Sequence, residues 1–164
     1  SREIFVITAS DNLFKSADGR ENFAALAPEA RSTEDQGIIS SAPRPNPFGS
    51  ILGSRDRISA FLLDPNDFFT LYLGSAEGLL RSRDGGFNWE RLNLLIPPED
   101  LPVSALTVHP RSSQVIFAGA GTQLHQSTDG GVSWSFAALP VTSRIQSLAI
   151  SPLEPQLMFA TLGR

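Results

Sequence analysis

An eight-residue motif occurs twice in the chain and is the strongest indication of how it folds. Residues 82–89 read SRDGGFNW, and residues 127–134, which begin 45 positions later, read STDGGVSW. A weaker third copy, SADGRENF, occupies residues 16–23, with Phe23 at the tryptophan position and Arg20 in place of the second glycine. A motif that returns at a fixed interval indicates an internal structural repeat.

A second marker recurs in step with the first. Three apolar runs, over 58–65, 103–110 and 145–152, each end in a proline, and these prolines are separated by 45 and then 42 residues. Another β-like run begins six residues after each proline. Short β-branched and aromatic runs bounded by Gly and Pro are typical of strands and exclude helical solenoid repeats. Four short strands per unit, with a period in the forties, are typical of a β-propeller blade.

The repeat divides the chain into blades. We expect a partial blade over 1–25, a Pro/Ser-rich insertion over 26–57, whole blades over 58–102 and 103–144, and a partial blade over 145–164. The expected strands lie near 3–8, 12–16, 22–25, 58–64, 70–75, 78–82, 88–94, 103–108, 115–119, 123–127, 133–138, 145–150 and 157–161. Closed propellers have four to eight blades. The expectation is therefore a segment of a larger propeller, or one completed by assembly, with closure of the chain on itself as the alternative.

The Ser-x-Asp-Gly-Gly-x-x-Trp motif resembles the Asp-box (BNR-type) repeat of sialidases, xyloglucanase-type glycoside hydrolases, sortilin-like receptors and photosystem II assembly/stability factors. The resemblance covers nearly everything except 24–57 and implies an all-β propeller, or an open arc of one, with four-stranded antiparallel blades. It assigns a structural turn role to Ser16, Asp18, Gly19, Phe23, Ser82, Asp84, Gly85, Gly86, Trp89, Ser127, Asp129, Gly130, Gly131 and Trp134.

These residue types suit a turn on physical grounds. An aspartate accepts hydrogen bonds from amides two residues further on, and the glycines supply positive φ. Each tryptophan is expected to begin the outer strand and bury its ring between layers. A calcium loop of the EF-hand kind would need further carboxylates and a distal Glu, which neither copy has. The motif therefore indicates a structural turn, with no metal site.

Composition excludes several function classes. The chain has no Cys, so it has neither disulfides nor thiol chemistry nor a Cys-based zinc site. Lys+Arg is 13 against Asp+Glu 17, a formal net charge of −4, which argues against nucleic acid as a partner. No apolar run approaches the length of a membrane span.

The search for catalytic residues is negative. His109 is expected at the end of a strand, and His125 is expected within a strand with its side chain half-buried. Tyr72 is the only tyrosine and is expected in the core. The remaining carboxylates that could act in glycoside hydrolysis are scattered over turns and strand ends: Asp64, Asp67, Glu77, Glu90, Glu99 and Asp100. We therefore assign no catalytic, cofactor-binding or metal-binding residue.

Two regions are candidates for partner contact. The insertion contributes Arg44 and Phe48, and the neighbourhood of the first complete motif contributes Arg81 and Arg83. The alternatives are a plain surface excursion and solvated hairpin tips. An Ala-rich stretch over 24–30 could hold a helical turn, limited by Pro28.

The repeats and the lack of a catalytic set indicate a non-catalytic protein-binding or assembly/scaffold propeller module that needs no cofactor. The resemblance to photosystem II assembly factors and sortilin-like receptors implies a location outside the cytoplasm (periplasmic, lumenal or secreted). The alternative is a carbohydrate-active propeller, either a sialidase- or xyloglucanase-like hydrolase or a glycan-binding module. A third hypothesis is a subunit of a larger surface or membrane-associated complex that uses the Pro/Ser-rich insertion as its tether.

Overall fold

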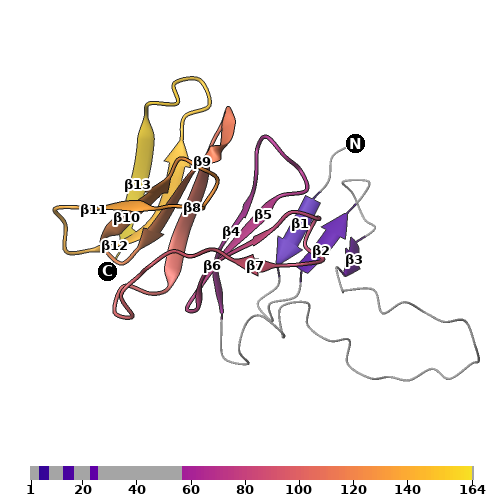
Figure 1. Ribbon diagram of the computed structural model, residues 1–164, viewed down its shortest axis with the longest axis horizontal. Helices are drawn as coiled ribbons and strands as arrows, with labels where there is room; N and C mark the ends of the chain where they lie inside the picture. Colours follow the sequence, from indigo (N-terminus) through magenta and orange to yellow (C-terminus); the bar gives the residue numbers. More distant parts are fainter. Residues whose placement is uncertain (1–3, 8–12, 17–22, 26–56, 164) are drawn as a thin grey trace, which may run out of the picture. The chain divides into compact units, whose positions relative to one another are not determined.

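The structure is a computed structural model that describes residues 4–7, 13–16, 23–25 and 57–163 (Figure 1). The chain divides into two units, Ser1–Arg55 and Asp56–Arg164. The described part of the chain contains no helix with the length and apolar character of a membrane span.

The first unit contains one antiparallel sheet. It consists of β1 (Ile4–Ile7), β2 (Leu13–Ser16) and β3 (Phe23–Ala25), paired in the order β1-β2-β3. Ser16 lies opposite both Ile4 and Phe23 in the register, and it is buried. All three predicted N-terminal strands are therefore confirmed. Asp18, Gly19, Arg44, Phe48 and the predicted helical turn after 25 lie outside the described residues.

The second unit contains two four-stranded antiparallel meanders and a two-stranded sheet. The first meander is β4 (Ile58–Leu63), β5 (Leu71–Ser75), β6 (Gly78–Ser82) and β7 (Glu90–Arg91). The second is β8 (Val103–His109), β9 (Ser112–Ala120), β10 (Gln123–Ser127) and β11 (Ser135–Ala138). The last sheet pairs β12 (Arg144–Ile150) with β13 (Met158–Gly163). We call each of these three sheets a blade.

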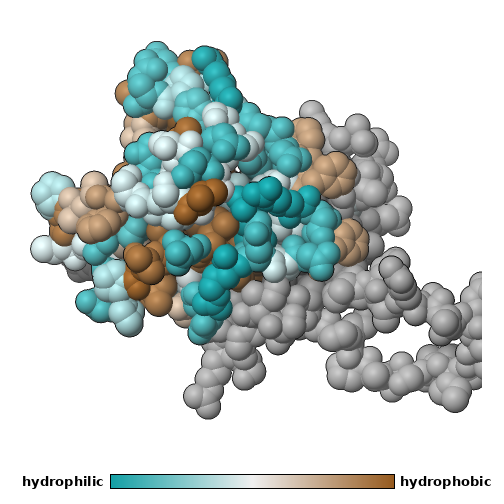
Figure 2. Space-filling model, in the orientation of Figure 1, coloured by the Kyte–Doolittle hydropathy of each residue, from teal (hydrophilic) through white to brown (hydrophobic). Residues whose placement is uncertain are grey.

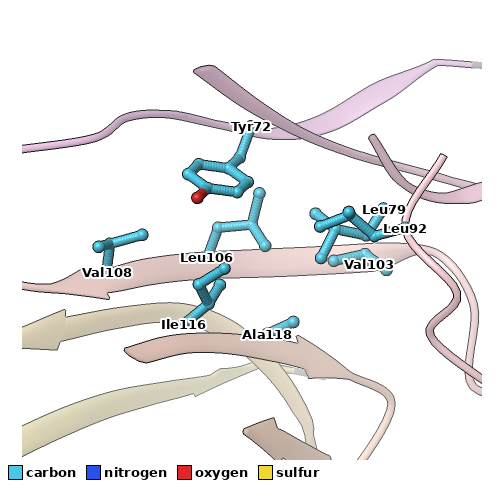
Figure 3. Packing of buried hydrophobic residues seen from close by; sticks show 8 residues of the cluster. All are labelled: Tyr72, Leu79, Leu92, Val103, Leu106, Val108, Ile116 and Ala118. Atoms are coloured by element: carbon cyan, nitrogen blue, oxygen red, sulfur yellow. The ribbon is translucent and has the colours of Figure 1, made fainter. Parts of the chain in front are cut away.

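The blades pack through their first strands. β8 contacts β4 and β5 on one side and β12 on the other. The main core lies between the first two blades, where Tyr72 extends from β5 toward Leu106 of β8 (Figure 3). Its fully and nearly buried members are Tyr72, Leu79, Leu92, Val103, Leu106, Val108, Ile116 and Ala118. A smaller cluster of Ala105, Ile145 and Leu148 joins the second blade to the third. Each large side chain removed from water here contributes about 1.5–3 kcal/mol to the free energy of unfolding.

The first strand of every blade in this unit has the same irregularity. The register shifts between Ile58 and Ala60, between Val103 and Ala105, and between Ile145 and Ser147. A bulge of this kind bends a strand and increases its twist. Because the shift recurs at equivalent positions in β4, β8 and β12, the repeated units share their backbone geometry as well as their sequence motifs.

The outer strand of the first blade is shorter than predicted. The sequence predicts a strand near 88–94, but β7 covers only Glu90–Arg91. The Leu92 N–H still donates to Leu79 O at 2.9 Å, whereas the Leu94 N–H turns back to Leu92 O, also at 2.9 Å. The chain therefore leaves the sheet at Leu92, and the apolar residues that follow lie outside it.

Candidate functional site

The first Ser-x-Asp-Gly-Gly-x-x-Trp turn, between β6 and β7, is closed by hydrogen bonds to Asp84. Ser82 Oγ donates to Asp84 Oδ1 at 2.7 Å and accepts the Gly86 N–H at 2.9 Å. Asp84 also accepts the backbone N–H of Asn88 at 2.9 Å and its side-chain amide at 2.6 Å. The indole N–H of Trp89 donates to Gly86 O at 2.9 Å. The polar groups of the motif thus bind one another.

The second turn, between β10 and β11, repeats this network. Ser127 Oγ donates to Asp129 Oδ1 and accepts the Gly131 N–H, both at 2.8 Å. Asp129 Oδ1 accepts the backbone N–H of Ser133 at 2.9 Å, and the Trp134 indole donates to Gly131 O at 3.2 Å. The expectation that each aspartate binds the amide two residues on is wrong. The serine hydroxyl oxygen accepts that amide N–H instead. The aspartate carboxylate accepts the N–H of the residue four positions after it, Asn88 in the first turn and Ser133 in the second.

The glycines have the predicted conformation in both turns. Their φ angles are 76° at Gly85, 98° at Gly86, 72° at Gly130 and 89° at Gly131. Side chains with a Cβ rarely adopt these values, so the two positions favour glycine. The tryptophans directly precede β7 and β11 and are half-buried, and Trp134 packs against the main core.

Hydrogen bonding keeps both turn aspartates ionised. Partial burial raises the pKa of Asp84, but hydrogen bonds from Asn88 and Ser82 outweigh it, so the pKa lies below its usual value. Hydrogen bonds from Ser133 and Ser127 lower the pKa of Asp129 to about 2. Among the residues that the structure describes, no group of three or more His, Asp or Glu is placed to hold a metal ion. Both carboxylates accept hydrogen bonds from residues of their own turns, so their observed role is to hold the turns closed.

Arg81 joins the first blade to the second. Its Nε and Nη2 lie 2.8 Å from Glu90 Oε1, and Nη1 donates to Gly130 O in the turn of the next blade. The Arg81 side chain is only 8% exposed, whereas that of Arg83 is 66% exposed and lies 3.4 Å from Glu90. Of this predicted pair of partner contacts, Arg83 is the one that presents its guanidinium to solvent.

A polar cavity of about 190 Å³ lies beside Arg81, between the two blades. Asp64 lines it and is fully buried. Its Oδ1 accepts hydrogen bonds from Asn66 N at 2.8 Å and, across the blade boundary, from Ser113 Oγ at 3.1 Å. Its Oδ2 has no hydrogen-bond partner. We call this space the inter-blade cavity; its lining residues are Asp64, Asp67, Thr70, Tyr72, Arg81, Arg83, Ser113, Gln114, Asp129 and Gly130.

The structure brings only some of the scattered carboxylates together. Asp64 and Asp67 share the inter-blade cavity. Glu77 instead lies 3.3 Å from Arg91, and Asp100 accepts a hydrogen bond from Gln123 at 2.8 Å. No pattern in the sequence predicts the cavity, because Asp64 and Ser113 are 49 residues apart and meet only through blade packing.

Tyr72 belongs to the core, as predicted, and also lines the inter-blade cavity. It lies opposite Arg81 in the β5–β6 register. Burial raises the pKa of the Tyr72 phenol, the charge of Asp64 raises it further, and Arg81 partly offsets both. The phenol is therefore neutral at physiological pH.

The two histidines lie at different depths. His109 ends β8, as predicted, and its Nδ1 accepts the Arg111 N–H at 3.2 Å. His125 on β10 is more deeply buried than predicted, at 1% exposure, and its ring centroid lies 5.9 Å from that of Phe136. Burial lowers the pKa of His125, so the ring is neutral near pH 7, and Nε2 has no hydrogen-bond partner.

An apolar groove lies where the chain leaves the first blade. Leu95, Val132 and Phe136 are 81%, 79% and 67% exposed. Two hollows of about 290 and 330 Å³ share Leu95 and Phe136 as lining residues. We call this surface the apolar groove; its residues are Asn93, Leu94, Leu95, Ile96, Pro97, Gln123, His125, Val132, Ser133, Trp134 and Phe136.

Sequence reasoning missed the apolar groove, because the run Leu92-Asn93-Leu94-Leu95-Ile96 was read as strand and the loop after it. The two prolines that follow the run were the available signal, since proline disfavours a continued strand. Figure 2 shows that hydrophobic patches interrupt the hydrophilic surface on one face of the molecule.

Comparisons with known proteins identify the fold. No protein-family profile and no curated protein matches the sequence. Among solved structures, an ancestral GH74 enzyme aligns over 96% of the chain with a TM-score of 0.65 and 14% identity. The GH74 xyloglucanase of Xanthomonas campestris aligns over 96% with a TM-score of 0.56 and 16% identity. The GH74 enzyme of Niastella koreensis aligns over 65% with a TM-score of 0.55 and 24% identity.

The aligned region spans only 20%, 25% and 19% of these three larger chains, in the same order. At such identities the likeness concerns the fold alone. The four-stranded antiparallel sheets and these neighbours agree, and the chain has a β-propeller-like fold.

Proposed function

We propose that this chain is a non-catalytic, Asp-box β-propeller module that binds a protein partner through the apolar groove. The observation that carries the proposal is the exposure of Leu95, Val132 and Phe136 around two adjoining hollows. Large apolar side chains gathered on a surface are typical of interaction sites, and aromatic residues are enriched in interfaces.

The chemistry of the apolar groove fits a peptide segment. Leu94, Ile96 and Trp134 pack against the main core, so the floor of the groove is fixed before a partner arrives. Asn93, Gln123 and Ser133 add polar groups at the same surface. These groups can bond to a peptide backbone while one or two large apolar side chains enter the hollows.

The polar groups of the described residues favour binding over catalysis. Asp84 and Asp129 are held within their turns, and Glu90 is paired with Arg81. Neither His109 nor His125 is hydrogen-bonded to a hydroxyl nucleophile. A catalytic pair of nucleophile and base would be expected within hydrogen-bond reach.

The proposal is tested by selecting from a random peptide display library on the immobilised 164-residue chain. We expect enrichment of sequences with large apolar or aromatic side chains, and loss of their binding to a Phe136→Ser variant. Phe159→Ser is the matched control, because Phe159 is similarly exposed (62%) but lies outside the apolar groove on β13. Failure to enrich any sequence, or equal binding to both variants, would contradict the proposal.

A carbohydrate-active propeller is the second candidate. Trp134 and Phe136 line the apolar groove with aromatic rings on which a sugar ring can stack. The three fold neighbours are described as GH74 proteins: two as enzymes and one as a xyloglucanase. A screen of xyloglucan and sialylated oligosaccharides separates the readings. Turnover of any of them would replace the first proposal, whereas binding without turnover would make the module a glycan binder.

We also propose that the module belongs to a larger complex and lies outside the cytoplasm, as the resemblance to Asp-box propellers implies. Fractionation of the native host cells, with detection of the chain by antibody, tests the location. Recovery only in the cytoplasmic fraction would contradict it.

A further inference from the structure

We propose that the inter-blade cavity binds an organic cation, through the primary ammonium or guanidinium group of a small amine or of a partner's side chain. This inference goes beyond the proposed function and concerns a different surface. It rests on the unpartnered oxygen of a buried carboxylate, on the charge of the cavity lining, and on a difference between the repeats.

The first support is Asp64. The residue is fully buried and lines the cavity, and three donors occupy its Oδ1: Asn66 N, Asn66 Nδ2 and Ser113 Oγ. Its Oδ2 has no hydrogen-bond partner. A buried carboxylate oxygen without a donor is costly, so a donor that enters the cavity and binds it is favoured.

The second support is charge. The lining contains the carboxylates of Asp64, Asp67 and Asp129. The arginines of the lining, Arg81 and Arg83, both lie within ion-pair distance of Glu90. With Glu90 included, acidic groups outnumber basic ones around the cavity, so a cation is attracted and an anion is repelled.

The third support comes from comparing the two complete repeats. Asp64, Tyr72 and Arg81 correspond, 45 residues later, to His109, Phe117 and Gln126. The strand register is the same, because Tyr72 pairs with Arg81 in one blade and Phe117 with Gln126 in the other. The blade fold therefore does not require this polar set. The presence of Asp64, Tyr72 and Arg81 in only one of the two complete repeats points to a role that is specific to this cavity.

The size and chemistry of the cavity favour an organic cation over a metal ion. A volume of about 190 Å³ accommodates a small organic group, since a water molecule in the liquid occupies roughly 30 Å³. The residues in the structure include no three His, Asp or Glu placed to ligate a metal. An ammonium or guanidinium group brings several N–H donors, one for Asp64 Oδ2 and others for neighbouring oxygens.

The test is an amide NMR titration of the full chain with methylguanidinium, and with N-methylurea as its neutral analogue of similar shape. We expect saturable shifts near Asp64, Ser113 and Gly130 with methylguanidinium only. Asp64→Asn keeps the shape and the Oδ1 acceptor but removes the charge, and should weaken binding by roughly tenfold or more. Asp100→Asn is the matched control, because Asp100 is half-buried outside the cavity and accepts a bond from Gln123.

Equal shifts with the two probes, no saturable shift with methylguanidinium, or unchanged affinity in a folded Asp64→Asn variant would overturn the proposal. The probe comparison uses the unmodified chain, so it stands even if Asp64→Asn does not fold. Agmatine and a capped Gly-Arg-Gly peptide then distinguish the sources. Tighter binding of the peptide assigns the cavity to a partner's side chain, and tighter binding of agmatine assigns it to a small amine.

Discussion

Gly119 of β9 lies so close to Ile145 of β12 that a Cβ on the glycine would come 2.7 Å from Ile145 Cγ2. The equivalent glycine one repeat earlier is similarly close to the next blade, since a Cβ on Gly74 of β5 would collide with the carbonyl oxygen of Val103 in β8. Neither glycine has positive φ, so conformational freedom does not explain them. Both lack a side chain because the first strand of the next blade occupies that space. The lack of a side chain at these two positions therefore allows successive blades to pack closely together.

Replacing Gly119 by alanine should lower the free energy of unfolding by about 1–3 kcal/mol, because the added methyl forces the blades apart. Chemical denaturation measures the change. Ile145→Ala removes the atom that the methyl meets, so the double variant should be less destabilised than the sum of the single variants. Strict additivity would show that the contact between these two residues does not limit blade packing.

Arg81→Gln should lower the free energy of unfolding by about 1–3 kcal/mol, because the substitution removes the buried bonds to Glu90 and to Gly130 O. Gln126 occupies the corresponding position in the next blade, so glutamine is compatible with the strand. Arg83→Gln is the control, since its exposed ion pair should contribute less than about 1 kcal/mol. An equal loss for both variants in urea denaturation would contradict a stabilising role for the buried bonds of Arg81.

The turn around Asp129 should contribute to stability in a way that depends on acid pH. Its pKa is about 2 in the folded chain against 3.8 for the free side chain, because Ser133 and Ser127 bind the carboxylate. The contribution of the Asp129 carboxylate to the free energy of unfolding is therefore present above pH 3.8 and is lost as the pH falls toward about 2. Thermal melting across this range should show a steeper fall in Tm for the unmodified chain than for Asp129→Asn. Parallel curves would contradict the assignment.

His125 should produce a second pH effect, closer to neutrality. Burial lowers its pKa below 6.5, so the unfolded chain takes up a proton more readily than the folded chain. Stability should therefore decline as the pH falls below about 6.5. His125→Leu should remove this decline, and leucine is the residue at the corresponding position, Leu80. A decline that persists in the variant would have to come from another group.

The sequence predicted the strands well because local signals define them. Alternating apolar runs that end at Pro65, Pro110 and Pro152, together with the two Asp-Gly-Gly turns, located the observed strands to within a few residues. Only β7 was much shorter than expected, since propensity alone could not show that the apolar chain after Arg91 leaves the sheet.

The candidate sites were harder to predict because they form where blades meet. Asp64 acquires its cavity only when Ser113 of the next blade packs against it, 49 residues away. Leu95, from the chain that has left the first blade, and Phe136, on β11 of the second, come together in the apolar groove. Such contacts depend on the packing of whole sheets, which no local pattern in the sequence encodes.

Calorimetric titration of a display-selected peptide into three forms of the full chain tests whether the apolar groove is the partner site. These forms are the unmodified chain, Phe136→Ser and Phe159→Ser. If the apolar groove is the partner site, Phe136→Ser should raise Kd by roughly tenfold or more, because truncating a central aromatic contact costs about 2 kcal/mol, while Phe159→Ser should leave Kd unchanged. An unchanged Kd for Phe136→Ser, or an equal rise for both variants, would contradict the claim.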